Sequence, residues 1–399
     1  MSLMREYLDK ERQGWNSDAL KQELKRLITE YNKRRSTYLF VYCAAFGKQI
    51  PDVSLVQDDF FIFHDMLLDK KINRKSLDIY LETPGGSGVV AEEIVRFLRN
   101  NYETINFVIS GEAKSAGTLM ALSGDNILMT ETGSLGPIDA QIRIGRFINS
   151  AYDYMEWVEE KHNEAKETQA LNPFDATIIA QISPGELNGV SHALSFAKDL
   201  AEKWLINYKF KNWSETETRK IKVTDEMKQS RAEEISKELI NHGRWRLHGR
   251  SIKIQDLEDL GLKIEKIDDD TTLANIIYRI QTVCRLLFST TTIYKIFSSA
   301  DANLARQALP AGLSGAMPLS LGIPSAPDVA EVVHKCQNCG EEYRFFAKFK
   351  NDKKIDSDFT LRDFLPFPKD AKLKCNCGFE TDLSGLKNQI ETQVGKKIL

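Results

Sequence analysis

The 399-residue sequence has no long apolar run and no excess of charge of either sign. No stretch approaches the ~20 consecutive apolar residues that a membrane-spanning helix needs, and the charged N-terminal stretch lacks the pattern of a secretory signal. The 54 lysines and arginines nearly balance the 57 acids, leaving a net charge of −3, which gives no reason to expect a nucleic-acid partner. We therefore expect a soluble, cytoplasmic protein with no membrane partner.

Cysteine and histidine are both scarce, with six of each. Cys43 and Cys284 are isolated in apolar surroundings, which predicts buried, inert thiols. The other four cysteines are grouped near the C-terminus. Because disulfides are not expected in a reducing cytosol, this grouping indicates a metal site. Six histidines also leave few candidates for a catalytic base.

The C-terminal cysteines form two glycine-ended pairs, Cys336 with Cys339 and Cys375 with Cys377. Four thiolates at such spacing are ligands for tetrahedral zinc, and a small segment with few large apolar residues needs such a tie. The second pair is one residue shorter than the usual C-x-x-C. We predict a zinc-ribbon-like module with a structural zinc. Since its four ligand positions are filled, the module would serve docking to a protein or, as the less favoured alternative, to nucleic acid.

Strand-like and helix-like segments alternate along the N-terminal part of the chain. Residues 37–45 are continuously apolar, as in a buried strand, and residues 56–68 have the apolar density of a helix packed on a sheet. Further strands are expected at 78–81, 105–109 and 126–129, separated by helical segments. This alternation predicts an α/β fold with a mostly parallel sheet and flanking helices.

Two of these strands end in glycine-rich turns. Residues 83–88, Thr-Pro-Gly-Gly-Ser-Gly, follow one strand, and residues 111–117, Gly-Glu-Ala-Lys-Ser-Ala-Gly, follow the next. Ser115 then lies on a strand-to-helix turn, where the first free N–H groups of the helix point toward whatever lies beside it. Glycines in the other turn expose N–H donors at the same sheet edge, which is what an oxyanion hole requires. The alternative is that Ser115 merely caps the helix.

The pairing of these turns resembles the Clp proteolytic subunit and the signal peptide peptidases, which share the Clp/crotonase fold. The resemblance covers roughly residues 37–268, and the whole chain with its cysteine-rich tail looks most like the SDH (serine dehydrogenase proteinase) family of that fold. It implies that Ser115 is the nucleophile of a serine endopeptidase and that the N–H groups of Gly86 and Ala116 bind the oxyanion. Hydrolysis of a peptide or protein substrate would then pass through an acyl-enzyme.

The general base is less clearly marked. The segment after the nucleophile helix is similar to the one that holds the catalytic histidine of the Clp subunit, but Asp139 stands at that position here. A carboxylate of ordinary pKa accepts a serine proton poorly. We therefore predict that His248, near where the Clp subunit holds its triad acid, is the base and that Asp139 orients it.

Other assignments of the base stay open. A histidine hydrogen-bonded at a strand edge is the structural alternative for His248, and His192 lies on a long helix nearly opposite its apolar stripe. The signal peptide peptidases instead use a lysine whose pKa is lowered by burial. The lysines that such a role could involve are Lys114, Lys161, Lys166 and Lys198.

The rest of the chain adds helices on both sides of this core. Ser183 and Pro184 fit the start of a long helix with apolar positions up to Tyr208. In the Clp fold a long helix at this place projects toward a neighbouring subunit, so the resemblance implies a homo-oligomer. The pattern of residues 151–171 predicts an inserted helix, and that of residues 272–297 predicts one more helical stretch. The predicted organisation is an N-terminal amphipathic helical segment (1–36), a Clp/crotonase-fold protease domain (37–270), a helical extension (271–309), a flexible linker (310–330) and the zinc-ribbon-like domain (331–399).

Two other functions fit part of these residues. Acyl-CoA hydratases of the crotonase group share a two-amide oxyanion hole, but they need no serine at position 115, and the sequence has no adenine-binding signature. The second alternative is a catalytically inactive scaffold of the Clp fold, which assembles through the long helix and recruits partners through the zinc module. The uncertain base keeps this alternative open.

Overall fold

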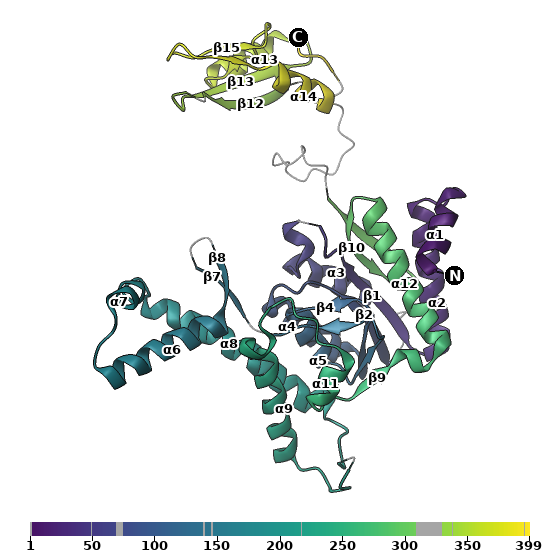
Figure 1. Cartoon of the computed structure of the whole chain (residues 1–399). Helices are drawn as coiled ribbons and strands as arrows, with labels where there is room; N and C mark the ends of the chain where they lie inside the picture. Colours follow the sequence, from purple (N-terminus) through teal and green to yellow (C-terminus); the bar gives the residue numbers. More distant parts are fainter. Residues whose placement is uncertain are drawn as a thin grey trace. The chain divides into compact units, whose positions relative to one another are not determined.

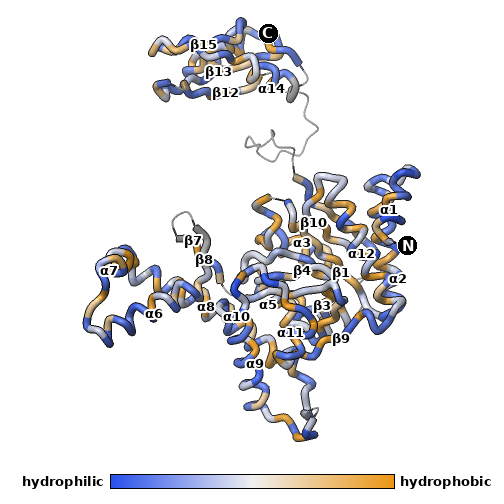
Figure 2. The backbone as a smooth tube through the Cα atoms, in the orientation of Figure 1, coloured by the Kyte–Doolittle hydropathy of each residue, from blue (hydrophilic) through white to orange (hydrophobic). Residues whose placement is uncertain are grey.

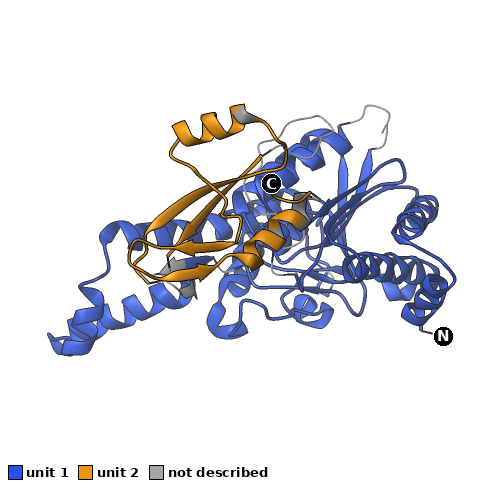
Figure 3. Ribbon diagram, turned by 90° about the horizontal axis from the view of Figure 1, so that it is seen from above, with its two compact units in different colours: residues 1–314 blue, residues 315–399 orange. Residues whose placement is uncertain are grey.

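The computed structural model describes residues 2–48, 50–68, 75–138, 140–144, 147–216, 218–308, 329–336, 338–394 and 396–399. The chain divides into two compact units, residues 1–314 and 315–399 (Figure 3). The predicted linker, 310–330, lies almost wholly outside the described residues. In the described chain, no helix is both long and apolar enough to cross a membrane.

The first unit is built on a seven-stranded sheet with the order β11-β10-β1-β2-β3-β5-β9 (Figure 1). The five strands from β1 to β9 run parallel to their neighbours, whereas β10 is antiparallel to β1 and β11 to β10. The prediction of a mostly parallel sheet is therefore confirmed. The strands are β1 (Tyr38–Ala44), β2 (Ser76–Glu82), β3 (Thr104–Ile109), β5 (Asn126–Met129), β9 (Ile264–Lys266), β10 (Ile293–Ser298) and β11 (Asn303–Gln307).

Helices cover both faces of this sheet, so its central strands β1, β2 and β3 are buried at almost every position. Successive side chains of a strand point to opposite faces. Phe40 and Tyr42 accordingly join one core cluster, and Leu39 and Val41 join the other. The first cluster includes α3 (Gln57–Leu67), α4 (Gly88–Asn101) and α5 (Ala116–Leu122), and the second includes α1 (Leu3–Arg12), α2 (Ser17–Arg35) and α12 (Thr271–Thr290).

The helix predicted over residues 272–297 is wrong in its last part. Helix α12 ends at Thr290, and residues 293–298 form β10, which pairs with β1 inside the sheet. The sequence Ile-Tyr-Lys-Ile-Phe-Ser is buried at every position, and its β-branched and aromatic residues suit a strand covered on both faces. The segment after residue 270 thus supplies two strands, β10 and β11, to the sheet of the first unit.

A helical arm extends from the sheet of the first unit (Figure 1). Ser183 caps its long helix by accepting a hydrogen bond from Glu186 N (3.1 Å), and Pro184 is the first helical residue, as predicted. Figure 2 shows the second half of α6 as largely hydrophilic. This part of the chain contains β7 (Gln141–Ile144), β8 (Phe147–Ser150), α6 (Ala151–Thr168), α7 (Pro173–Ile179), α8 (Pro184–Trp204) and α9 (Asp225–Ile240).

The second unit has its own small core. Phe345, Phe346 and Phe349 are buried and belong to this core. Its elements are β12 (Val329–Lys335), β13 (Glu342–Lys348), α13 (Lys353–Leu361), β14 (Leu365–Pro366), β15 (Lys372–Lys374), β16 (Glu380–Asp382) and α14 (Ser384–Val394).

Helix α1 lies within the N-terminal segment 1–36 that was predicted to be helical, and a salt bridge holds it against α12. Arg279 donates to both carboxylate oxygens of Glu6 at 2.9 Å, and Tyr7 beside them is fully buried. The guanidinium of Arg279, assisted by Lys10, lowers the pKa of Glu6 to about 2. The pair therefore stabilises the docked helix fully above the ordinary pKa of 4.5, and this stabilisation is lost as the pH falls through about 2.

We expect the substitution Arg279→Met to raise the pKa of Glu6 toward 4.5, because it removes the main cause of the lowering. Titration of the Glu6 carboxyl by NMR measures the change. Arg12→Met is the control, since Arg12 pairs only with Asp9 on the same helix among the described ion pairs. An unchanged pKa in Arg279→Met would contradict this role of the salt bridge.

Candidate active site

Ser115 sits on a strained turn between β3 and α5. The chain leaves β3 at Ile109, forms the short strand β4 (Glu112–Ala113) and enters α5 at Ala116. Ser115 has φ 49° and ψ −115°, a left-handed conformation that costs a non-glycine residue on the order of 1–3 kcal/mol. Ser115 occupies the N-cap position of α5, but its side chain makes no capping hydrogen bond. Strain of this kind is found where a turn must present a side chain.

Main-chain hydrogen bonds join this turn to the glycine-rich turn after β2. Thr83 N donates to Glu112 O (2.9 Å), and Lys114 N donates to Thr83 O (3.0 Å). Gly85, with φ 95°, lies directly against the serine: a Cβ on Gly85 would be 2.8 Å from the Ser115 Cβ. The two turns therefore meet, and the contact requires glycine at position 85.

Gly86 is held from its other side by Leu55. Leu55 N donates to Gly85 O (2.7 Å), and Ser87 N donates to Leu55 O (3.0 Å). A Cβ on Gly86 would lie 2.4 Å from Leu55 N, so a side chain has no room here either. None of the hydrogen bonds found in the described part of the chain uses the N–H of Gly86 or Ala116. In the described residues, these two amides therefore have no hydrogen-bond acceptor.

Lys114, the residue before Ser115, supports the turn through the hydrogen bonds of its buried ammonium group. It is 4% exposed, and its Nζ donates to Leu135 O (3.2 Å), Arg250 O (3.3 Å) and Ser251 Oγ (3.0 Å). Burial lowers its pKa. These contacts fasten the short strand β6 (Ser134–Leu135), which pairs with β4, to the segment leading to Ile252. Its amino group is thus engaged by several acceptors, and no bond to Ser115 is recorded in the described residues.

The two residues predicted to act on the proton of Ser115 are only partly described. Asp139 lies outside the described residues. The chain on either side of it is fixed, because Ile138 N donates to Leu239 O (3.0 Å) and Ala151 N donates to Ala140 O (2.8 Å). His248 is half-buried on the loop before Ser251, the residue that Lys114 contacts.

The structure contains an imidazole–carboxylate pair that sequence reasoning missed. His242 begins α10 (His242–Trp245), and its Nδ1 lies 2.8 Å from a carboxylate oxygen of Asp153 on α6. His242 stands only three residues after Leu239, whose carbonyl binds the chain next to position 139. Nothing in the local sequence indicates this pair, because its members are 89 residues apart.

The other titratable candidates are placed less favourably for general-base catalysis. His192 and Lys166 are exposed, and His64 packs against the ring of Phe97 with centroids 5.0 Å apart. Glu164 and Asp175 bind Lys161 and raise its pKa, which is the opposite of what a lysine base needs. Lys198 pairs with Glu202 at 3.3 Å.

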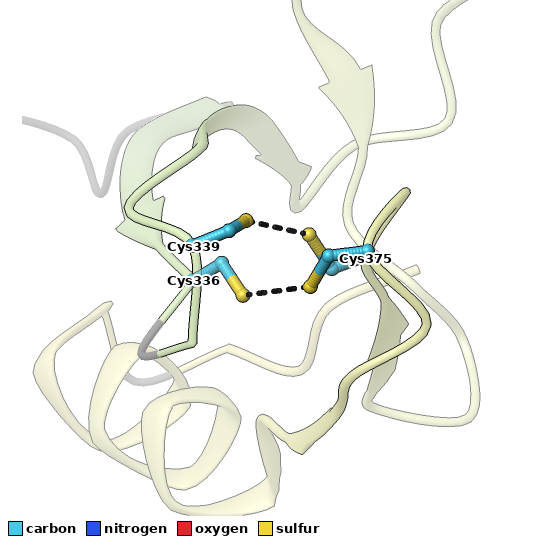
Figure 4. Close-up of side chains that lie close together, drawn as sticks. Cys336, Cys339 and Cys375 are labelled. Carbon is cyan, nitrogen blue, oxygen red and sulfur yellow. Dashed lines mark hydrogen bonds between the residues drawn. The ribbon is translucent and has the colours of Figure 1, made fainter.

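The four cysteines of the second unit come together as the sequence indicated (Figure 4). Their Sγ atoms all lie within 4.8 Å of one another, with 3.8 Å between Cys336 and Cys377 and 3.4 Å between Cys339 and Cys375. A tetrahedral thiolate site with metal–sulfur bonds of about 2.3 Å needs a sulfur spacing of about 3.8 Å. The cluster therefore fits a metal ion.

The chain is similar to a known protein family and to two known proteins. Residues 67–199 match the family of ClpP-like SDH-type serine proteinases. Two uncharacterized proteins of Methanocaldococcus jannaschii are similar. MJ0137 is 26% identical over 61% of this chain and 73% of its own length, and MJ1495 is 35% identical over 16% and 23%.

Among solved structures, an alanine mutant of the 1510-N membrane-bound stomatin-specific protease matches 56% of this chain and 79% of its own, with 14% identity and a TM-score of 0.33. Another alanine mutant of that protease, in complex with a substrate peptide, matches 53% and 70%, with 16% identity and a TM-score of 0.32. The family match spans both glycine-rich turns and Ser115. The similarity to ClpP-like SDH-type serine proteinases thus lies in the segment that carries the candidate site.

Proposed function

We propose that this chain is a serine endopeptidase that hydrolyses peptide bonds through an acyl-enzyme on Ser115. The observation that carries the proposal is the strained Ser115 turn, joined by hydrogen bonds to a glycine turn and flanked by two amides without partners in the described chain. Ser115 Oγ attacks the substrate carbonyl carbon, the N–H groups of Gly86 and Ala116 bind the developing oxyanion, and water then releases the acyl group. Each donor contributes about 3 kcal/mol to lowering the barrier.

The proton of Ser115 needs an acceptor, and we propose His248 for this role with Asp139 orienting it. The contacts of Lys114 with Arg250 and Ser251 support this assignment, because they tie the loop after His248 to the residue that precedes Ser115. The pair His242–Asp153 is the second candidate. A carboxylate bound to Nδ1 fixes the imidazole tautomer and leaves Nε2 to accept a proton.

We also propose that the four cysteines hold a structural zinc and that the chain forms a homo-oligomer. The sulfur spacing supports the first proposal. Exposed apolar side chains on the arm support the second: Phe174 is 75% exposed and Ile178 is 36% exposed on α7. Zinc would hold the turns of the second unit together, and it takes no part in hydrolysis because the four thiolates fill its coordination positions.

Replacing Ser115 by alanine tests the nucleophile. We expect Ser115→Ala to abolish both labelling by a tagged fluorophosphonate and hydrolysis of fluorescein-labelled casein, while thermal unfolding shows that the protein remains folded. Ser123→Ala, at the other end of α5, is the matched control and should be labelled like the wild type. Labelling that persists in Ser115→Ala, or a wild type that is not labelled, would reject the nucleophile and favour the scaffold.

The rate of fluorophosphonate labelling also distinguishes the two possible bases. We expect His248→Gln to lower this rate by about 100-fold or more, because the serine loses its proton acceptor. His242→Gln and the exposed control His192→Gln should change it little. The reverse result, with His242→Gln inactive and His248→Gln near the wild type, would move the base to the His242–Asp153 pair.

Zinc binding has its own measurement. Elemental analysis of the purified full chain should find about one zinc per chain, since four thiolates complete one tetrahedral site. Cys375→Ser should lose the metal and the hydrogen-exchange protection of β12 and β13, while labelling of Ser115 persists. Cys284→Ala, a buried cysteine of the first unit, should keep the zinc. A Cys375→Ser protein that keeps both the zinc and the protection would contradict the assignment.

A further inference from the structure

A fully buried ion pair joins strand β10 to helix α3. Lys295 on β10 and Asp59 on α3 are both 0% exposed, and Lys295 Nζ is 2.5 Å from Asp59 Oδ2. Taking two charges out of water is costly, and a pair of apolar residues of similar volume is often at least as stable. The cost of burying these two charges must therefore be offset by the groups that they bind.

Both members of the pair bind the same short segment of main chain. Lys295 Nζ donates to Ser54 O (2.8 Å), and Val56 N donates to Asp59 Oδ2 (2.9 Å). Tyr42 OH also donates to Asp59 Oδ2 (3.2 Å). Residues 54 and 56 are thus fixed by charge-assisted hydrogen bonds, which are stronger than neutral ones.

Leu55, the residue between these two anchors, contacts the turn that carries Gly86. It donates its N–H to Gly85 O (2.7 Å) and accepts from Ser87 N (3.0 Å), so it pairs with the backbone on both sides of Gly86. The missing side chain of Gly86 lets Leu55 come this close. Few atoms separate the ion pair from the Gly86 amide, and each link between them is a hydrogen bond or a peptide unit.

We propose that Lys295 and Asp59 are positioning residues that aim the amide of Gly86 at the oxyanion. The proposal rests on the function proposed above, in which the Gly86 N–H stabilises the tetrahedral intermediate. Neither residue touches substrate: they hold residues 54–56, these hold residues 85–87, and the orientation of one N–H follows. A displaced donor destabilises the transition state more than it lowers the affinity for substrate. The loss should therefore appear in kcat and not in KM.

Burial shifts the pKa values of Asp59 and Lys295 in the directions expected for a buried ion pair. The pKa of Asp59 is raised and that of Lys295 is lowered, in each case mainly by desolvation, and each partner opposes the shift of the other. Arg306 is a second cation near the carboxylate, with its Nη1 3.8 Å from Asp59 Oδ1. Removing Lys295 alone would therefore leave a buried acid with a weaker partner and destabilise the fold, so a single deletion cannot separate positioning from stability.

The test uses a double variant, Lys295→Met/Asp59→Leu, in the full-length chain. It removes both charges while keeping apolar volume, so no unpaired charge is left in the core and the protein should remain folded at the assay temperature. The carbonyl of Ser54 and the N–H of Val56 nevertheless lose their partners. With fluorescein-labelled casein we expect kcat to fall by about 100-fold, the effect of losing one oxyanion donor, while KM changes by less than about threefold. A stable double variant with the kcat of the wild type would overturn the proposal.

Asp59→Asn is a second variant in case the double variant does not fold; it leaves Lys295 without its carboxylate partner, so it is assayed well below its melting temperature. It keeps the shape of the side chain and an acceptor for Val56 N, and we expect kcat to fall by about tenfold at unchanged KM. A kcat equal to that of the wild type would overturn the proposal. The matched control is Arg99→Met, which removes a nearly buried cation bound to Asp125 at 2.7 Å and makes no recorded contact with residues 54–56. The kcat of Arg99→Met should remain near that of the wild type. An equal loss of kcat in this control would show that the effect is general destabilisation.

Ser115 labelling keeps this proposal separate from the proposed function. If the wild type neither reacts with fluorophosphonate nor cleaves casein, the peptidase assignment fails before the variants are compared. If the wild type reacts and cleaves while both ion-pair variants retain kcat, only the positioning role fails.

Discussion

The close approach of two main-chain turns is the constraint on which the rest of the site depends. Gly85 lies so near Ser115 that no side chain fits between them. The hydrogen bonds of Thr83 with Glu112 and Lys114 maintain this approach. They are possible because β2 and β3 are adjacent parallel strands, whose carboxyl ends meet at one edge of the sheet. The long-range order of the sheet therefore places the serine beside the amides, and the strain at Ser115 is tolerated because both turns are anchored on strands.

Much of this frame follows from local sequence patterns. Strands covered on both faces need apolar residues at nearly every position, so the runs that form β1 and β3 could be recognised without knowing their neighbours. The glycine turns could be recognised because backbone contacts at a site exclude side chains, as they do at Gly85 and Gly86. The start of α8 at Ser183 and Pro184 depends on capping chemistry that is local to the chain. The paired cysteines of the second unit are local signals of the same kind.

The features that sequence reasoning missed depend on partners far away in the chain. Strand β10 follows an apolar helix without a strong turn signal, and only its pairing with β1 makes it a strand. The partner of His242 is 89 residues away and that of Lys295 is 236 residues away, so neither side chain reveals its role in its own neighbourhood. Lys295 in particular stands in an apolar run, where a lysine would ordinarily mark a position facing water. Its burial is explained only by Asp59 and the carbonyl of Ser54.

The groups that support the site extend well beyond the segment that carries the chemistry. The family match covers residues 67–199 and contains both turns. Leu55 binds the Gly86 turn from before that segment, and Arg250 and Ser251 bind Lys114 from after it. Lys295 comes from further still along the chain. A turn with positive φ at a serine stays in place only when its surroundings over-determine it. The matched segment alone would lack the flank of Gly86 and two acceptors of Lys114, so the strained turn depends on residues both before and after that segment.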